Sequence, residues 1–183
     1  MNATYPDPTD ALPEEHLYKD YRLRNLHGRN EPATAQAIVR FWLEHGVLPA
    51  AEAHRRVTEV VYAAFDRHGA LAGVNTVYTG MRPDDGQTYY FYRTFIRPAD
   101  RGVFGLPRTM LRLTLEHLGS RTAPTGPVGL MIVTENPKLM RKSSIAIATR
   151  MGLHRLGKDS RGYDVWGLRF DGGIPLPLPT GPG

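Results

Sequence analysis

The sequence predicts an α+β fold with a central mixed, mostly antiparallel sheet flanked by helices. One observation behind this prediction is the order of the expected elements, β-α-α-β-β-β-α-β-α-β-β. A second is a clear hairpin around Asp66–Gly69, and a third is the length of 183 residues, which suits one domain. We therefore expect a single domain over residues 16–170, between an N-terminal arm (1–15) and a C-terminal tail (171–183).

The first part of the domain should hold one strand and two helices. Tyr21–Leu26 alternates polar and apolar residues well enough for a strand. Pro32 opens a helix whose apolar residues recur every three or four positions, and Gly46 ends it. A short second helix is expected around Ala50–Val57. The arm before these elements contains several prolines among polar residues, so we expect it to be loosely ordered.

Three consecutive strands are expected next. Val60–Phe65 and Leu71–Thr79 are the two strands of the hairpin, joined by the turn Asp66–Gly69. After a polar loop, Thr88–Ile96 is rich in aromatic and β-branched residues, which favour strands. The loop Arg97–Gly102 then leads out of the sheet.

The rest of the domain should alternate helices with strands. These elements are the helix Gly105–Leu118 with Pro107 in its first turn, the apolar strand Pro127–Thr134, the helix Pro137–Met151 and the strands Leu153–Leu156 and Tyr163–Phe170. The tail alternates apolar residues with proline over residues 174–179 and cannot supply the donors of a strand ladder. Two interpretations stay open for it: a disordered end, or a strap that lies on the domain.

Composition limits the possible chemistry. The chain has no cysteine, which excludes disulfides, thiolate metal sites and a covalent cysteine intermediate. Its seven histidines show no metal-ligand spacing, so no metal is expected. A formal net charge of +5 favours anionic partners. No apolar run is long enough for a membrane helix and the start does not resemble a signal peptide, so we expect a cytoplasmic protein that does not bind membranes.

Three passages in this order resemble the GNAT superfamily of N-acyltransferases. They are the hairpin Tyr62–Gly73, the strand, loop and glycine turn Phe95–Leu106, and the helix end Arg150–Leu153, with the turn Asp159–Tyr163 and a last strand after it. The resemblance implies the GNAT fold, use of acetyl-CoA or another acyl-CoA as co-substrate, and direct acyl transfer to an amine.

The sequence also departs from the family pattern. Phe104 and Leu106 stand where the phosphate-binding turn of the family has a glycine and a small residue. Ala148 stands where many members have a tyrosine, and Thr88–Ile96 lacks the carboxylate that many members carry on this strand. The resemblance therefore supports CoA binding better than it supports a named acid or base.

The turn after Ile96 is the candidate phosphate site. A glycine turn that opens a helix presents free N–H groups and the positive end of the helix dipole to an anion, and five arginines lie near it in the sequence. The alternative is a solvated basic loop. The residues expected to contact the co-substrate are Thr94, Phe95, Ile96, Arg101, Gly102, Val103, Phe104, Gly105, Arg108 and Asn136.

Two residues are candidates for catalysis. Glu135 directly follows the apolar strand, where burial could raise its pKa and make it a general base. The alternative is that Glu135 only starts a helix, as Asn136 could by capping it. Tyr92 is the second candidate, in a strand whose aromatic residues could line a pocket or simply pack in the core.

The acceptor should bind near the two N-terminal helices and the strand Thr88–Ile96. The residues expected there are His54, Arg55, Arg56, Tyr90 and Tyr92. The predicted function is transfer of an acyl group, most simply acetyl, from acyl-CoA to an amine acceptor of unknown class. Two other functions stay open: a CoA- or partner-binding module without catalysis, and an acyltransferase whose donor is an acidic acyl carrier protein. A homodimer is also left open, whereas no motif indicates a nucleic-acid partner.

Overall fold

The computed structural model describes residues 14–135 and 141–179. Eight strands form one sheet in the order β1-β2-β3-β4-β5-β6-β8-β7. Every neighbouring pair is antiparallel except β5 and β6, which are parallel. The predicted α+β class with a mixed, mostly antiparallel sheet is therefore confirmed. The strands are β1 (Glu15–Tyr18), β2 (Tyr21–Asn25), β3 (Val60–Phe65), β4 (Leu71–Met81), β5 (Thr88–Ile96), β6 (Gly129–Thr134), β7 (His154–Lys158) and β8 (Asp164–Arg169).

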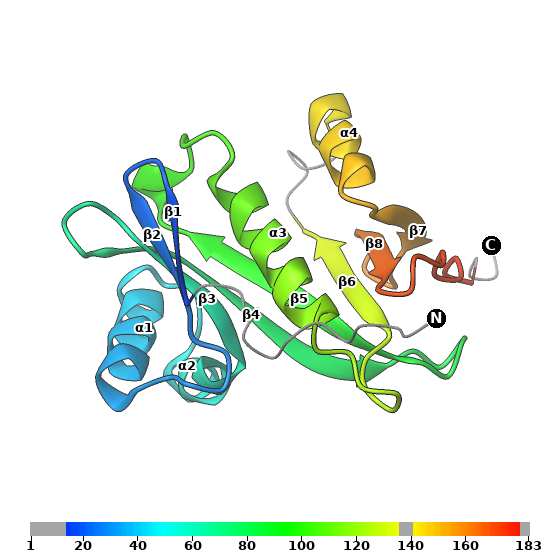
Figure 1. Ribbon diagram of the computed structural model, residues 1–183, viewed down its shortest axis with the longest axis horizontal. Coiled ribbons are helices and arrows are strands. Elements are labelled where there is room, and N and C mark those ends of the chain that lie inside the picture. Colours follow the sequence, from blue (N-terminus) through cyan, green and yellow to red (C-terminus); the bar gives the residue numbers. More distant parts are fainter. Residues whose placement is uncertain (1–13, 136–140, 180–183) are drawn as a thin grey trace, which may run out of the picture.

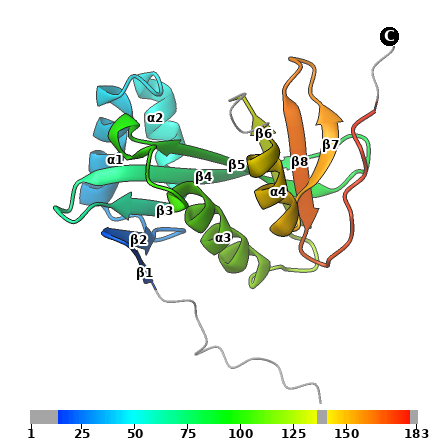
Figure 2. The ribbon, with the colours of Figure 1, turned by 90° about the horizontal axis from the view of Figure 1, so that it is seen from above.

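Helices cover both faces of the sheet. The α-helices are α1 (Pro32–Glu44), α2 (Ala50–Arg56), α3 (Leu106–Gly119) and α4 (Lys142–Arg150), with 3-10 turns η1 (Val57–Glu59) and η2 (Pro98–Asp100). Figure 2 shows α1 and α2 on one side of the sheet and α3 on the other. Each side has its own core: Ile38 and Trp42 of α1 pack on one face, and Met110 and Leu113 of α3 pack on the other. The helix expected over Pro137–Met151 lies partly outside the described residues, and α4 is its described part.

An N-terminal hairpin extends the sheet beyond what the sequence predicted. Only β2 was expected, but β1 pairs with it from Glu15 to Tyr18, and Lys19 forms the turn with a φ of 52°. The tip of this hairpin lies against the start of α3, because the Tyr18 hydroxyl donates a hydrogen bond to the carbonyl oxygen of Phe104. Figure 1 shows the hairpin (blue) at this end of the sheet.

β5 and β6 separate soon after they pair. Their parallel register runs only from Tyr90 opposite Leu130 to Tyr92 opposite Ile132. Beyond that point β5 continues to Ile96 with β4 as its partner, while β6 continues to Thr134 with β8. The sheet therefore opens on the carboxyl side of Tyr92.

The described part of the C-terminal tail lies on the domain as a strap. The N–H of Leu178 donates to the carbonyl of Leu156 in β7 at 2.7 Å, and Arg82 donates to the carbonyl of Leu176 at 2.9 Å. Leu178 also packs with Tyr89 and Leu156. Of the two open interpretations, the strap is correct for residues 171–179. Within the described ranges, no helix is long and apolar enough to span a membrane.

Candidate active site

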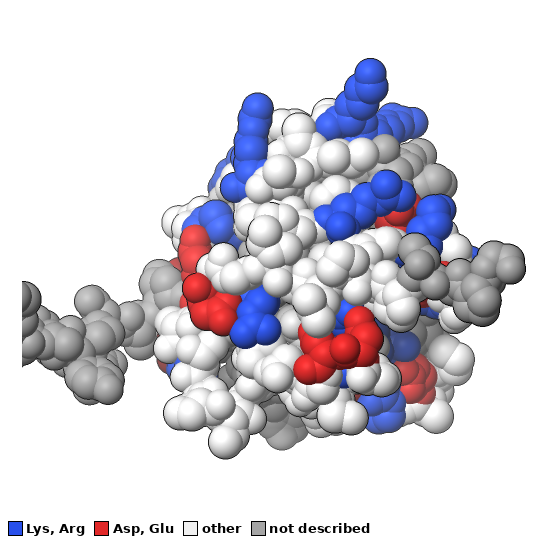
Figure 3. All heavy atoms as spheres, turned by 90° about the vertical axis from the view of Figure 1, so that its right-hand side faces the viewer, with Lys and Arg blue, Asp and Glu red and all other residues white. Residues whose placement is uncertain are grey.

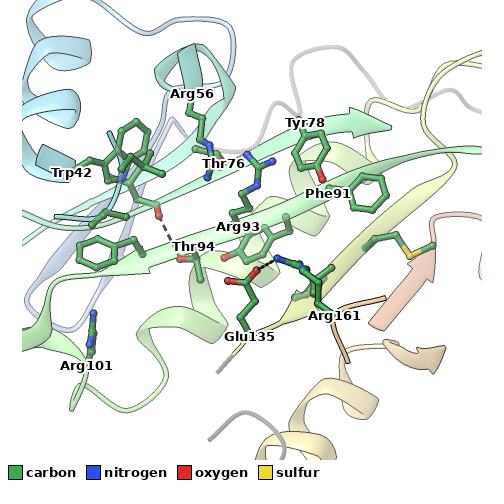
Figure 4. A pocket seen from close by; sticks show the side chains of 18 residues that line it. Trp42, Arg56, Thr76, Tyr78, Phe91, Arg93, Thr94, Arg101, Glu135 and Arg161 are labelled. Carbon is green, nitrogen blue, oxygen red and sulfur yellow. Dashed lines mark hydrogen bonds and ion pairs between the residues drawn. The ribbon is translucent and has the colours of Figure 1, made fainter. Parts of the chain in front are cut away.

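A cavity of about 870 Å³ opens on the α1–α2 face where β5 and β6 separate. Figure 4 shows side chains from α1, α2, β4, β5 and β6 around it. Its apolar lining includes Trp42, Phe91 and Met131. Its charged side chains are Arg56, Arg93, Arg101, Arg161 and Glu135. The cavity therefore combines an apolar floor with several guanidinium groups.

The main chain of β5 is unpaired along the opening. Successive residues of a strand direct their N–H and C=O groups to opposite sides. The N–H of Arg97 bonds the carbonyl of Ala72 on the β4 side, so the main-chain groups of Thr94 and Ile96 face the opening. The ladder with β6 ends at Tyr92, and Arg101 Nε donates to the Ile96 carbonyl at 3.1 Å. Within the described part of the chain, the Thr94 main chain thus keeps free hydrogen-bonding groups for an extended ligand.

The turn from β5 to α3 presents unpaired donors. Gly105 is the N-terminal cap of α3, with a φ of +89° that a residue with a side chain adopts only with strain. The N–H groups of Gly102, Phe104, Gly105 and Arg108 have no acceptor among the described residues. Together with the helix dipole they can hold an anion. These donors are therefore available even though Phe104 and Leu106 stand where the family pattern has a glycine and a small residue.

Within the described ranges, only some of the arginines near the turn are free of carboxylate partners and so able to bind an anionic ligand. Arg97 is held by Asp66 and Asp100, at 2.9 and 2.5 Å. Arg101 and Arg108 have no carboxylate partner in the described residues. Arg101 lies 5.5 Å from the ring centre of Phe95, and Arg108 lies 6.0 Å from that of Phe104. Arg101 and Arg108 are therefore the two arginines of this turn whose charge is available to a phosphate.

The ion pair between Arg97 and Asp100, which fixes the turn after β5, is joined by a hydrogen bond from Tyr21. The Tyr21 hydroxyl donates to Asp100 at 2.7 Å, and burial together with this bond raises the pKa of Tyr21 to about 12. Asp100 thus accepts hydrogen bonds from both Tyr21 and Arg97. These contacts fix the 3-10 turn η2 directly before the free donors, so the donors are positioned before any ligand arrives.

Tyr92 lies between the core and the cavity. Its side chain packs with the α3-side core, and it also lines the cavity. Its hydroxyl is 3.4 Å from Asn75 Nδ2, and burial raises the pKa of Tyr92 to about 12. The hydroxyl therefore stays protonated and can act as a proton donor but not as a base at neutral pH.

The expected burial of Glu135 is wrong. Its side chain is 62% exposed and forms an ion pair with Arg161 at 3.0 Å, because β6 has already left β5 at this point. Glu135 does line the cavity, as Figure 4 shows, so it lies at the opening. Asn136 lies outside the described residues. Among those that are described, no three histidine, aspartate or glutamate side chains gather as metal ligands.

The remaining candidates divide between the cavity and other surroundings. Thr94, Phe95 and Arg101 line the cavity, whereas Ile96 and Tyr90 pack on the α3 side. Of the residues expected at the acceptor side, Arg56 and Tyr92 line the cavity, and Arg55 points to its carboxylate partners. The candidate residues did not include several polar and aromatic side chains that line the cavity, among them Trp42, Thr76, Tyr78, Arg93 and Arg161. The alternation of β5, which puts Phe91, Arg93 and Phe95 on one face, was the available signal for Arg93.

No family model and no curated protein matches the sequence. Several solved structures do resemble the fold. A GCN5-related N-acetyltransferase from Kribbella flavida is 17% identical, with a TM-score of 0.57 over 82% of this chain and 98% of that one. A GNAT-family acetyltransferase from Streptococcus pneumoniae is 14% identical, with a TM-score of 0.57 over 81% and 99% of the two chains. The ribosomal-protein-S5-alanine acetyltransferase of Vibrio fischeri is 12% identical, with a TM-score of 0.58 over 88% and 99%. At these identities the likeness concerns the fold, and the chain has the fold of the GNAT N-acetyltransferases.

Proposed function

We propose that the protein is an N-acetyltransferase that moves the acetyl group of acetyl-CoA directly to an amine. The observation that carries the proposal is the opening between β5 and β6. It joins a turn with free N–H donors at one end to the cavity on the α1–α2 face. The three solved structures described above are named as acetyltransferases, which supports the same assignment.

The residues around the opening fit a CoA thioester. The free N–H groups before α3, with Arg101 and Arg108, would hold its phosphates. The unpaired main chain of Thr94 would pair with the extended amide arm, as an added strand does. Bound acetyl-CoA supplies the thioester carbonyl and a thiolate leaving group.

The reaction needs a neutral amine, a place for the proton it loses and a proton for the thiolate. The amine nitrogen forms the bond to the carbonyl carbon, the carbon–sulfur bond breaks, and the amine proton leaves. Glu135 at the opening would accept that proton, directly or through one water. The Tyr92 hydroxyl stays protonated and would donate a hydrogen bond to the leaving sulfur, and the proton that Glu135 accepts would pass through water to the thiolate. The chain has no cysteine, and direct transfer needs no covalent intermediate on the protein.

A calorimetric titration with acetyl-CoA tests the donor site. Arg101→Ala should weaken binding by about 10- to 100-fold, since it removes a charged donor beside the turn. Arg112→Ala is the matched control, because Arg112 is bonded to Glu116 on the exposed surface of α3. Release of free thiol with a panel of amines then tests transfer. The absence of both acetyl-CoA binding and thiol release would overturn the proposal.

An acyl carrier protein is a second candidate donor. Figure 3 shows Lys and Arg side chains gathered at the end of the molecule where α4 lies. Arg141, Lys142 and Arg150 are exposed there, and an acidic carrier protein would complement them. Transfer rates with acetyl-CoA and with an acetylated carrier protein, compared at low and high salt, separate the two donors. If the carrier protein is the donor, transfer from it should be much faster than transfer from acetyl-CoA at low salt, and high salt should remove this difference.

A further inference from the structure

The part of the cavity beside α2 and β4 contains two arginines from different elements. Arg56 comes from the end of α2 and Arg93 from the middle of β5. In Figure 4 both side chains extend toward the region beside Thr76 and Tyr78. Their side chains are only 24% and 32% exposed, so the charges are partly removed from water. A partly buried cation requires acceptors for its N–H groups, and the described residues supply acceptors for only some of them.

Carboxylates hold each guanidinium group from one side only. Glu52 accepts from Arg56 Nε, and Glu59 accepts from Arg93 Nη1 at 3.2 Å. Within the described ranges, both terminal nitrogens of Arg56 and the Nε and Nη2 of Arg93 have no acceptor. Each arginine thus keeps donors for a ligand.

The surrounding charges fix these side chains in place. Arg55 bridges the two carboxylates, at 2.8 Å from Glu52 and 2.6 Å from Glu59. Hydrogen bonds from Arg55 and Arg56 lower the pKa of Glu52 to about 2, so it stays ionised. Arg93 also stacks on Tyr78, with its guanidinium carbon 4.0 Å from the ring centre. Three guanidinium groups share two carboxylates, which leaves one positive charge without a counter-ion.

Arg93 lies where an anionic group bound to it would be close to the reacting amine. Arg93 is the first residue of β5 after the last pair with β6, so it lies directly at the opening. An anionic group held by Arg93 is therefore close to the point where the thioester would lie. The ring of Phe91, stacked on Tyr78 at 5.0 Å between ring centres, provides an apolar surface beside it. The acceptor should combine an amine, a nearby anion and an apolar body.

From this geometry we infer that the acceptor is an amine that carries a carboxylate, of the α-amino acid class, whose carboxylate binds Arg56 and Arg93. The inference rests on the proposed acetyltransferase function and names the acceptor class for the same cavity. A cationic polyamine is excluded as the preferred acceptor, because the lining has four arginines and a single carboxylate, Glu135, which is itself paired with Arg161. Spermidine, named as the acceptor of one structural neighbour, therefore does not fit this cavity.

The first experiment measures binding without the donor. N-acetyl-L-phenylalanine and N-acetyl-L-phenylalaninamide differ only in the carboxylate, and calorimetry compares their affinities. The acid should bind about 10- to 100-fold more tightly than the amide, as expected for charge-assisted hydrogen bonds. Equal affinity, or no binding of either compound, would overturn the inference.

The second experiment uses variants. Arg93→Ala and Arg56→Ala should each remove most of the preference for the acid, whereas the control Arg112→Ala should keep it. Arg56→Ala changes the end of a surface helix, so it provides a folded variant even if Arg93→Ala unfolds, which circular dichroism checks. Loss of acetyl-CoA affinity in both variants, with the acid preference unchanged, would assign these arginines to the phosphates of the donor instead.

The third experiment separates failure of the inference from failure of the proposed function. Thiol release is measured with a panel of α-amino acids, their α-carboxamides and the corresponding decarboxylated amines. The acids should give kcat/KM values at least about tenfold higher than their amides. Turnover with the amides or with spermidine alone would leave the acetyltransferase function intact and overturn only the acceptor class.

Discussion

The hydroxyl of Tyr18 donates a hydrogen bond to the carbonyl oxygen of Phe104 at 2.7 Å, and Lys19 Nζ adds a second contact to the same oxygen at 3.1 Å. The carbonyl of Phe104 and the N–H of Gly105 belong to one trans peptide and point in opposite directions. The hairpin β1–β2 therefore turns the Gly105 N–H away from itself. A short strand that adds little to the core thus orients an N–H donor of the turn between β5 and α3.

Replacing Tyr18 by phenylalanine should weaken acetyl-CoA binding by about three- to tenfold. The ring still packs, but the Phe104 peptide loses its main anchor and can rotate. Calorimetry measures the change, with Tyr90→Phe as the control, since the Tyr90 hydroxyl has no hydrogen-bond partner in the described part of the chain. An unchanged affinity would show that the turn holds its conformation without the hairpin.

Glu135→Gln should reduce kcat by at least about tenfold and remove the acidic limb of the pH profile of kcat/KM. The carboxylate is 62% exposed and lies at the opening, so it can exchange protons with water between turnovers. Glu116→Gln is a matched control, because Glu116 also forms an exposed ion pair, with Arg112 on α3. Near-normal activity with an unchanged profile would leave the base unassigned.

Local sequence patterns predicted the central strands well because local interactions stabilise them. The turn between β3 and β4 is closed by Asp66, whose side chain accepts from the N–H groups of His68 and Ala70. The pattern failed for β1, where Leu17 is 70% exposed and the strand depends on pairing with β2. A short strand with one exposed apolar residue has no periodicity to detect.

The site was only partly predictable, because its properties depend on contacts between distant residues. The glycine turn and Arg101 could be identified from their place between a strand and a helix. The exposure of Glu135 could not, since it depends on where β6 leaves β5. The position of the Arg93 side chain depends on Glu59, which is 34 residues away, and on Tyr78 of the adjacent strand. Composition alone cannot separate such an arginine from Arg97, which forms ion pairs with two aspartates.

Asn75→Ala should lower the free energy of unfolding by roughly 2–4 kcal/mol. Asn75 is fully buried, and its side-chain oxygen accepts from the N–H of Tyr62 at 2.9 Å where the register of β3 and β4 shifts. Its amide donates to Thr114 of α3 at 2.9 Å. The alanine variant leaves a buried N–H without an acceptor and removes the link between sheet and helix.

Urea unfolding at neutral pH measures this loss. Thr114→Val provides the comparison, since it removes one partner of Asn75 and leaves the contact with Tyr62 in place, so it should lose less stability than Asn75→Ala. A loss below about 1 kcal/mol for Asn75→Ala would show that the Tyr62 N–H finds another acceptor.

Acid should destabilise the protein through His117. This side chain is 4% exposed, and burial, followed by the charge of Arg121, lowers the pKa of His117 to about 4. Its Nδ1 accepts from Asn25 at 2.9 Å, so the neutral ring carries its proton on Nε2 and donates to His27 at 3.1 Å. Protonation would place an Nδ1–H against the Asn25 amide. The native arrangement therefore fits only the neutral ring.

The sign of the effect follows from proton linkage. The unfolded histidine has a pKa of about 6.5 and the folded one about 4, so the unfolded chain binds more protons below pH 6.5. The contribution of His117 is complete above pH 6.5 and is lost as the pH falls toward 4, by about 2 kcal/mol at pH 5. Urea unfolding at pH 7.5 and pH 5.0 should show this loss in the wild-type protein. His117→Gln should show a smaller dependence on pH, whereas His68→Gln, a change in an exposed turn, should keep the full dependence. If His117→Gln retains the wild-type dependence on pH, the buried histidine is not its source.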